Sequence, residues 1–115
     1  MVINARQMKT VTVDKLRDGV GKTEIITLIE KEDMQGACRL FAHFTLKPGC
    51  SIGRHGHEGE EELYYIISGK GMVDDNGVKK IVQAGDATIT PSGCFHAIEN
   101  CGEDELEFLA CVLTY

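Results

Sequence analysis

The stretch that decides the fold lies in the middle of the chain, where residues 49–62 read GCSIGRHGHEGEEE. It contains His55 and His57, two histidines separated by a single glycine. Side chains at positions i and i+2 point to the same side of a β-strand, whereas on a helix they would diverge by about 200°. Gly56 and Gly59 allow the backbone to bend tightly around an ion. On a strand, this stretch therefore predicts two imidazole nitrogens that face one metal ion.

Short runs rich in β-branched and aromatic residues surround this stretch, and turn signals containing glycine separate them. The runs are Glu24–Glu30, Arg39–Leu46, Leu63–Ile67, Val78–Val82, Ala87–Thr90 and Leu106–Leu113. Asp75-Asn76-Gly77, between two of them, is a strong hairpin signal. Many short strands at close spacing favour an all-β sandwich or barrel. Evidence for a helix is limited to a short turn within Val13–Gly21, with Asp14 as its cap and Gly19 as its stop.

Length, charge and cysteine content narrow the class of protein. A chain of 115 residues suits one hydrophobic core, so we expect a single domain over residues 1–115. The net charge of -6 argues against a nucleic acid or an anionic membrane as partner, because both attract clustered Lys and Arg. No run approaches the roughly 20 apolar residues of a membrane helix, and we expect no secretory signal. Five cysteines without a CxxC pair favour free thiols in the cytoplasm.

Two of the predicted strands are apolar on both faces. Leu63–Ile67 and Phe108–Leu113 do not alternate between apolar and polar residues. One face of each strand can fill the core, but the other must also be covered. We therefore expect a homodimer, with a partner subunit over the outer face. The alternative is that N-terminal strands of the same chain cover it.

The sequence offers few side chains to complete a metal site. A carboxylate would come from the acidic run that follows His57, and the other histidines are His43 and His96. His96 follows a tight turn, Pro91–Phe95, that leads into a strand. Three imidazoles and one carboxylate suit Mn, Fe, Ni, Co or Zn, and are too rich in nitrogen for Mg or Ca. On a six-coordinate ion, these four ligands would leave two positions for water, substrate or dioxygen.

Two spaced patterns in the chain resemble the two motifs of the cupin superfamily, in particular those of small cupins with one conserved barrel domain. The first motif is filled by Gly49, His55, His57, Glu62 and Gly69. The second motif is filled by Gly85, Pro91, Gly93, His96 and Asn100. Both patterns match at every signature position, and residues 70–84 between them resemble the short intermotif loop of small microbial cupins.

The resemblance implies a specific architecture and a specific ligand set. The fold would be a double-stranded β-helix, or jelly roll, and the site would hold one divalent transition metal inside the barrel mouth. The ligands implied by the matched positions are His55, His57, Glu62 and His96.

The choice between Glu61 and Glu62 depends on strand register. The motif spacing to Gly69 favours Glu62, and so does the two-residue alternation of a strand. In that register Tyr64 shares the inner face with Glu62, while Tyr65 faces outward. Glu61 and its acidic neighbours Glu58 and Glu60 are then expected to be solvated charges at the rim.

Two side chains are candidates for moving protons beside the ion. Tyr64 lies two residues from Glu62, and His43 lies on the strand that leads to the first motif. Each also has a structural interpretation, Tyr64 as a packed core residue and His43 as a hydrogen-bonded histidine. Cys94, two residues before His96, would line the pocket or act as a small packed hydrophobe.

The fold of a protein does not determine which reaction the protein catalyses. Cupins of this kind include dioxygenases, oxalate-degrading enzymes, isomerases, lyases and ligand-sensing modules. The resemblance and the open metal positions favour a metalloenzyme for a small polar organic acid or hydroxylated molecule, with oxalate-decarboxylase-like or dioxygenase-like chemistry. The alternative is a non-catalytic module that binds a small ligand or the metal. A pocket without a proton-transfer group would favour that alternative.

Overall fold

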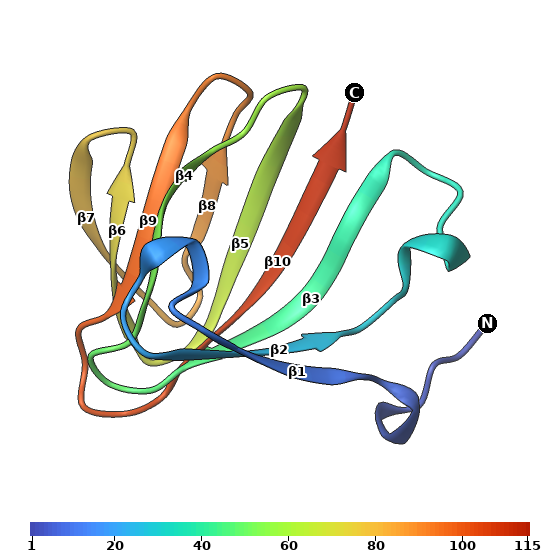
Figure 1. Ribbon diagram of the computed structural model, residues 1–115, viewed down its shortest axis with the longest axis horizontal. Coiled ribbons are helices and arrows are strands. Elements are labelled where there is room, and N and C mark those ends of the chain that lie inside the picture. The colour runs from blue at the N-terminus through green and yellow to red at the C-terminus, as the bar shows by residue number, and fades with distance from the viewer.

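The computed structural model describes residues 1–115 and consists mostly of β-strands (Figure 1). Two antiparallel sheets pack face to face, with strand orders β1-β2-β3-β10-β5-β8 and β4-β9-β6-β7. The strands are β1 (Thr10–Asp14), β2 (Lys22–Thr27), β3 (Cys38–Leu46), β4 (Ser51–Gly56), β5 (Glu60–Ser68), β6 (Lys70–Asp75), β7 (Val78–Gln83), β8 (Ala87–Thr90), β9 (Phe95–Asn100) and β10 (Leu106–Thr114). The helical segments are three short 3-10 turns, η1 (Ala5–Gln7), η2 (Leu16–Asp18) and η3 (Lys31–Asp33). None of these turns is long enough to cross a membrane.

This arrangement is the all-β jelly roll that the sequence predicts. All six predicted strands are present, with ends that differ by a few residues. Strands β4 and β9 carry His55 and His96, which were also expected on strands, and β1 and β6 complete the two sheets. The sequences of β6 (KGMVDD) and β9 (FHAIEN) mix apolar residues with glycine and charged residues, which weakens the strand signal in the sequence.

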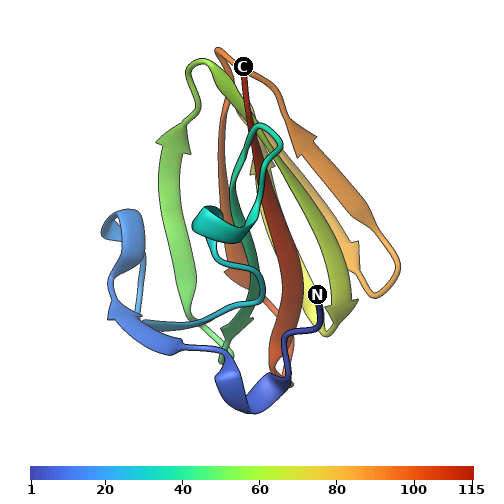
Figure 2. The same ribbon diagram turned by 90° about the vertical axis from the view of Figure 1, so that its right-hand side faces the viewer.

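The short turn predicted within Val13–Gly21 is η2, and Gly19 ends it as predicted. Its N-cap is Lys15 instead of the predicted Asp14, and no side chain caps it. Three non-glycine residues of this segment have positive φ values, so the backbone is left-handed and offers no ordinary helix N-terminus to cap. The turn lies beside β4 at the edge of the smaller sheet (Figure 2).

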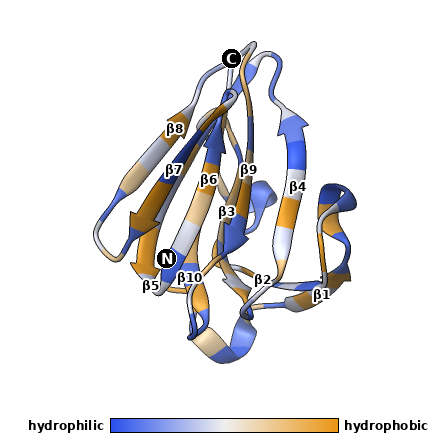
Figure 3. Ribbon diagram, turned by 90° about the vertical axis from the view of Figure 1, so that its left-hand side faces the viewer, coloured by the Kyte–Doolittle hydropathy of each residue, from blue (hydrophilic) through white to orange (hydrophobic).

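The centre of the core is supplied by β10, which lies between β3 and β5 (Figure 1). Alternate residues of β10 are almost completely buried, and Phe108 is 0% exposed. Its ring packs against Phe44 and Tyr64, with centroid distances of 5.3 and 4.6 Å. In Figure 3, β4 shows a hydrophobic band that is followed by hydrophilic bands toward its C-terminal end.

The asparagine of the second motif closes one end of the barrel. Asn100 is 2% exposed, and its side-chain Nδ2 donates to the carbonyl oxygens of Leu46 and Asp104 at 2.8 Å each. Its Oδ1 accepts the N–H of Gly102 at 2.9 Å. Because Asn100 ends β9 and Leu46 ends β3, this side chain ties the smaller sheet to the larger one.

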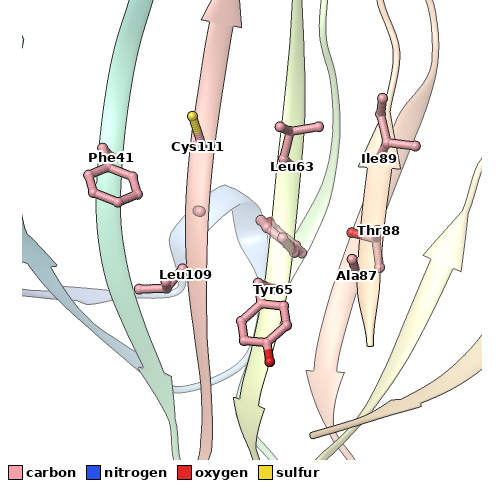
Figure 4. A pocket seen from close by; sticks show the side chains of 10 residues that line it. Phe41, Leu63, Tyr65, Ala87, Thr88, Ile89, Leu109 and Cys111 are labelled. Atoms are coloured by element: carbon pink, nitrogen blue, oxygen red, sulfur yellow. The ribbon is translucent and has the colours of Figure 1, made fainter. Parts of the chain in front are cut away.

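The outer face of the larger sheet is apolar. Strand β5 alternates as predicted, with Glu62 and Tyr64 buried and Tyr65 51% exposed. Strands β1 and β2 extend the sheet from the edge of β3, so the N-terminal strands do not cover this face. A groove of about 430 Å³ runs over β3, β10, β5 and β8 (Figure 4). Its apolar walls include Phe41, Leu63, Tyr65, Ile89, Leu109 and Cys111.

Candidate metal centre

Strands of both sheets bring the four predicted ligands together. His55 on β4 pairs directly with His96 on β9, and Glu62 enters from β5 in the opposite sheet. His57 follows the last residue of β4, and its N–H donates to the carbonyl oxygen of Cys94 at 3.1 Å. Cys94 thus joins the two motifs through its backbone, and its thiol is not part of the pocket wall.

The donor atoms converge on one point. His96 Nε2 lies 3.0 Å from His55 Nε2 and 3.2 Å from His57 Nε2. Glu62 Oε1 lies 2.9 Å from His96 Nε2, 3.1 Å from His57 Nε2 and 3.7 Å from His55 Nε2. His57, Glu62 and His96 are at most 5% exposed, and the neighbouring Glu61 is not part of the cluster. The cluster could hold one metal ion.

Each imidazole is oriented by a partner on its other nitrogen. His55 Nδ1 donates to the carbonyl oxygen of Gly53 at 2.8 Å, and His57 Nδ1 donates to Glu60 Oε1 at 2.9 Å, because both partners can only accept. This leaves the Nε2 lone pairs of both rings facing inward, as metal ligation requires. His96 Nδ1 lies 2.8 Å from the hydroxyl of Thr90. Lone pairs that face one another repel unless a cation lies between them, so the donor set fits a metal ion.

The protonation states also suit a metal. Burial raises the pKa of the Glu62 carboxyl, but the imidazoles of His55, His96 and His57 around it outweigh this effect and bring the pKa to about 2. Burial lowers the pKa of His96 and favours its neutral form. An ionised carboxylate and neutral imidazoles are the forms that bind metal.

Tyr64 is brought to the ligands. It lines the same pocket as His55, His57 and Glu62, and its ring stacks on that of His96 at 5.1 Å. Burial raises the pKa of the Tyr64 hydroxyl well above its usual value, and the negative charge of Glu62 adds to this effect. The hydroxyl therefore keeps its proton and can donate a hydrogen bond.

His43 is not brought to the ligands. It lies on the face of β3 opposite to Ala42 and Phe44, which are buried in the core. Its Nε2 lies 3.2 Å from Glu107 Oε1, and its partner across β10 is Leu109, which lines the outer groove. The strand register turns this side chain outward, so its position fits the structural interpretation of His43 and not the one that places it beside the metal.

Sequence reasoning missed a pair of residues behind His57. Glu60 was expected to be a solvated rim charge, but it contacts His57 Nδ1 and accepts two hydrogen bonds from Arg39. The Arg39 Nε and Nη2 atoms lie 2.6 and 2.7 Å from its two oxygens. The hydrogen bond from Arg39 is the largest reason that the pKa of Glu60 falls to about 2. No spacing in the sequence signals this pair, because Arg39 lies far upstream on another strand.

The family follows from a match over most of the chain. Residues 42–112, a span that contains both motifs and all four ligand candidates, match the family model described as the cupin domain. The chain belongs to the cupin family. Its jelly roll and its three-histidine, one-glutamate cluster are those that the resemblance implies.

This cupin is similar to proteins of Thermotoga maritima and Methanocaldococcus jannaschii. It is 43% identical over 113 residues to the oxalate-binding protein of Thermotoga maritima, covering 98% of this chain and 93% of that protein. A crystal structure of a predicted oxalate decarboxylase from Thermotoga maritima aligns with a TM-score of 0.95 at 43% identity, over 100% of both chains. An uncharacterized protein of Methanocaldococcus jannaschii is 30% identical over 100 residues, covering 85% of this chain and 80% of that protein.

The contact between Glu60 and His57 gives a test of metal affinity in this cupin. Glu60→Ala should weaken metal binding by roughly 10- to 100-fold, because His57 loses the acceptor that orients its ring. Competition with a chromophoric chelator measures the affinity. Glu58→Ala is the matched control, since Glu58 is exposed and belongs to no ion pair or side-chain hydrogen bond. Equal affinities for the two variants would contradict the assigned role of Glu60.

Proposed function

We propose that this cupin holds one divalent transition metal with His55, His57, Glu62 and His96 and binds a small organic acid such as oxalate at that metal. The observation that carries the proposal is the convergence of four donor atoms whose rings are oriented from behind. Mn, Fe, Ni, Co and Zn all suit this donor set. The Thermotoga maritima relative, described as oxalate-binding, supports the choice of ligand.

The pocket in front of the cluster suits a small ligand. It has a volume of about 150 Å³, and His55, His57 and Glu62 form part of its wall. Its apolar walls are formed by Leu16, Ile25, Leu40, Phe44, Ile52 and Val112. Apolar walls exclude water and so strengthen the electrostatic interactions inside. A divalent ion bound here would supply two open positions for carboxylate oxygens and would stabilise their negative charge.

The side chains in the pocket favour binding over turnover. Apart from the ligands, its titratable groups are Tyr64, Arg17 and Arg39. Tyr64 keeps its proton, and arginine does not lose one, so the pocket has hydrogen-bond donors but no general base. These groups can orient an anion without moving a proton from it.

Oxalate-decarboxylase-like turnover is the second candidate. The Tyr64 hydroxyl beside the ligands would have to supply the proton with which oxalate gives formate and carbon dioxide, and its raised pKa opposes that release, so binding is the first candidate. Dioxygenase-like chemistry would use the same open positions on the ion. Neither reaction requires the outward-facing His43.

Calorimetric titration with oxalate tests the proposal. Protein loaded with one equivalent of Mn(II) should bind oxalate, whereas protein stripped by a chelator should not, because the carboxylate oxygens then lose their principal partner. Formate and carbon dioxide should not accumulate in the loaded sample. Their appearance would favour decarboxylation, and a loaded protein that binds no oxalate would contradict the proposed function.

We also propose that a second copy of the chain covers the apolar outer groove. The groove lies on the four strands β3, β10, β5 and β8, and the N-terminal strands leave it open. Light scattering should give twice the mass of one chain for the natural sequence and a monomer for Leu109→Glu, because a buried carboxylate lacks a partner there. Val78→Glu, at an exposed site on the smaller sheet, should remain a dimer. A monomeric natural protein would contradict the proposal.

The cytoplasmic location stays a prediction. It rests on the five cysteines, all of which are free in the structure, as a reducing compartment would keep them. The Sγ atoms of Cys38 and Cys111 lie 3.8 Å apart, so these two thiols are close enough to react with each other in an oxidising compartment.

A further inference from the structure

The wall of the pocket carries one positively charged side chain without a partner. Arg17 and Arg39 both line the pocket beside the ligands. The Arg39 guanidinium is matched by the carboxylate of Glu60, which accepts from it at 2.6 and 2.7 Å. The Arg17 guanidinium belongs to no ion pair and to no side-chain hydrogen bond of the structure. An unmatched cation beside an electropositive metal site attracts an anion.

The turn that carries Arg17 is held in one place by local packing. Lys15, Arg17 and Asp18 have φ values of 54°, 54° and 62°, a left-handed conformation that such residues rarely adopt. Such conformations persist only where their surroundings impose them, and they cluster at functional sites. Gly53 of β4 permits the close approach of the turn, because a Cβ atom there would overlap the Arg17 carbonyl oxygen. Since the Gly53 carbonyl also accepts from His55 Nδ1, one residue positions both the turn and a ligand.

The charges of the site can be counted from these contacts. A divalent ion, the Glu62 carboxylate and the Arg17 guanidinium together carry two net positive charges, because Arg39 and Glu60 neutralise each other. A dianion would balance this charge, whereas a monocarboxylate would leave one positive charge unmatched. The volume of about 150 Å³ restricts the dianion to a small one.

We propose that Arg17 is the second anchor of the ligand and makes the pocket selective for small dicarboxylates over monocarboxylates. One end of the ligand would lie at the metal, and the acidic group at the other end would accept from the Arg17 guanidinium. This inference rests on the proposed function, because it takes metal-bound organic acids as the ligand class. Arg17 acts on affinity and selectivity and has no part in holding the metal.

Titration of the manganese-loaded full chain with oxalate, and separately with acetate, tests the inference. Arg17→Gln should bind oxalate roughly 10- to 100-fold more weakly, because a charged hydrogen bond is lost, while its acetate affinity stays within about twofold. Arg17→Lys should give an intermediate loss, since it keeps the charge but not the forked donor. Lys15→Gln, in the same turn but outside the pocket wall, is the matched control and should bind both acids normally. The metal content of each variant is measured in parallel.

The outcomes separate this inference from the proposed function. Equal oxalate affinity in Arg17→Gln and the natural protein would overturn the role of Arg17 and leave metal-dependent binding intact. A parallel loss of oxalate affinity and acetate affinity, or of metal content, would assign Arg17 a general structural role and would also overturn the inference. A loaded natural protein that binds no oxalate would overturn both.

Discussion

Substitution of His96 by alanine is expected to remove nearly all of the bound metal from the purified protein. Its Nε2 lies within 3.2 Å of three other donor atoms, and the residue is 1% exposed, so no nearby side chain can replace it. Elemental analysis of untagged protein should fall from close to one metal per chain to close to zero. An ion bound only by the folded state stabilises that state, by about 4 kcal/mol at a concentration a thousandfold above its Kd. Metal should therefore raise the unfolding temperature of the natural chain and not that of His96→Ala.

His43→Ala is the control for this experiment. It also removes an imidazole, but from the outer face of β3, where the ring contacts Glu107. Its metal content should match that of the natural chain. A His96→Ala protein that keeps one equivalent of metal would show that the ion lies elsewhere.

Replacing Phe108 with alanine should destabilise the metal-free protein by about 3–5 kcal/mol. The side chain is completely buried and packs against Phe44 and Tyr64, so its removal leaves a cavity where the two sheets meet. For a chain of this size, the midpoint of thermal unfolding should fall by on the order of 10 °C or more. Urea unfolding followed by circular dichroism, at one fixed protein concentration, measures the change in free energy.

Phe108→Leu distinguishes the effect of lost side-chain volume from the effect of lost aromatic contacts. It keeps most of the buried apolar surface, so it should lower the free energy of unfolding clearly less than Phe108→Ala does. A Phe108→Ala cost under about 1 kcal/mol would mean that the core refills the space and that the ring stack contributes little.

The metal cluster could be predicted because residue type and spacing mark it. The HxH pattern required a strand to place His55 and His57 on one side, and the two motifs then named Glu62 and His96. The alternation of β5 was equally informative, since it placed Tyr64 inside and Tyr65 outside. These predictions needed only the two-residue periodicity of the strands and the resemblance to the cupin motifs.

The face of β3 could not be predicted in this way. Phe41, Ala42, His43 and Phe44 place bulky or apolar side chains on both sides of the strand, so the pattern does not select an inner face. A shift of one residue in register would turn every side chain over. The pairing with β10 decides the register, and that pairing is a property of the folded chain.

Two further features depend on contacts between distant segments. The Arg39–Glu60 pair joins β3 to the start of β5, and no periodicity relates the two residues. The left-handed turn around Arg17 is formed by Lys15, Arg17 and Asp18, residue types that do not signal positive φ as glycine does. Both features support the metal pocket, so local sequence rules fail where tertiary contacts shape the site.

The two ends of β9 contact the opposite sheet through different kinds of interaction. At one end the side chain of Asn100 reaches β3, and at the other His96 meets Glu62 of β5 through the shared donor cluster. Withdrawal of the ion would leave the contact between His96 Nδ1 and the Thr90 hydroxyl as the remaining side-chain link at the His96 end, so partial opening of the metal-free chain should begin there and leave the Asn100 end closed. The Asn100 end of the barrel would thus stay closed in both states, whereas closure of the His96 end would depend on the metal. Proteases would cleave the metal-free protein first at the open end, so the supply of metal would affect the lifetime of the protein.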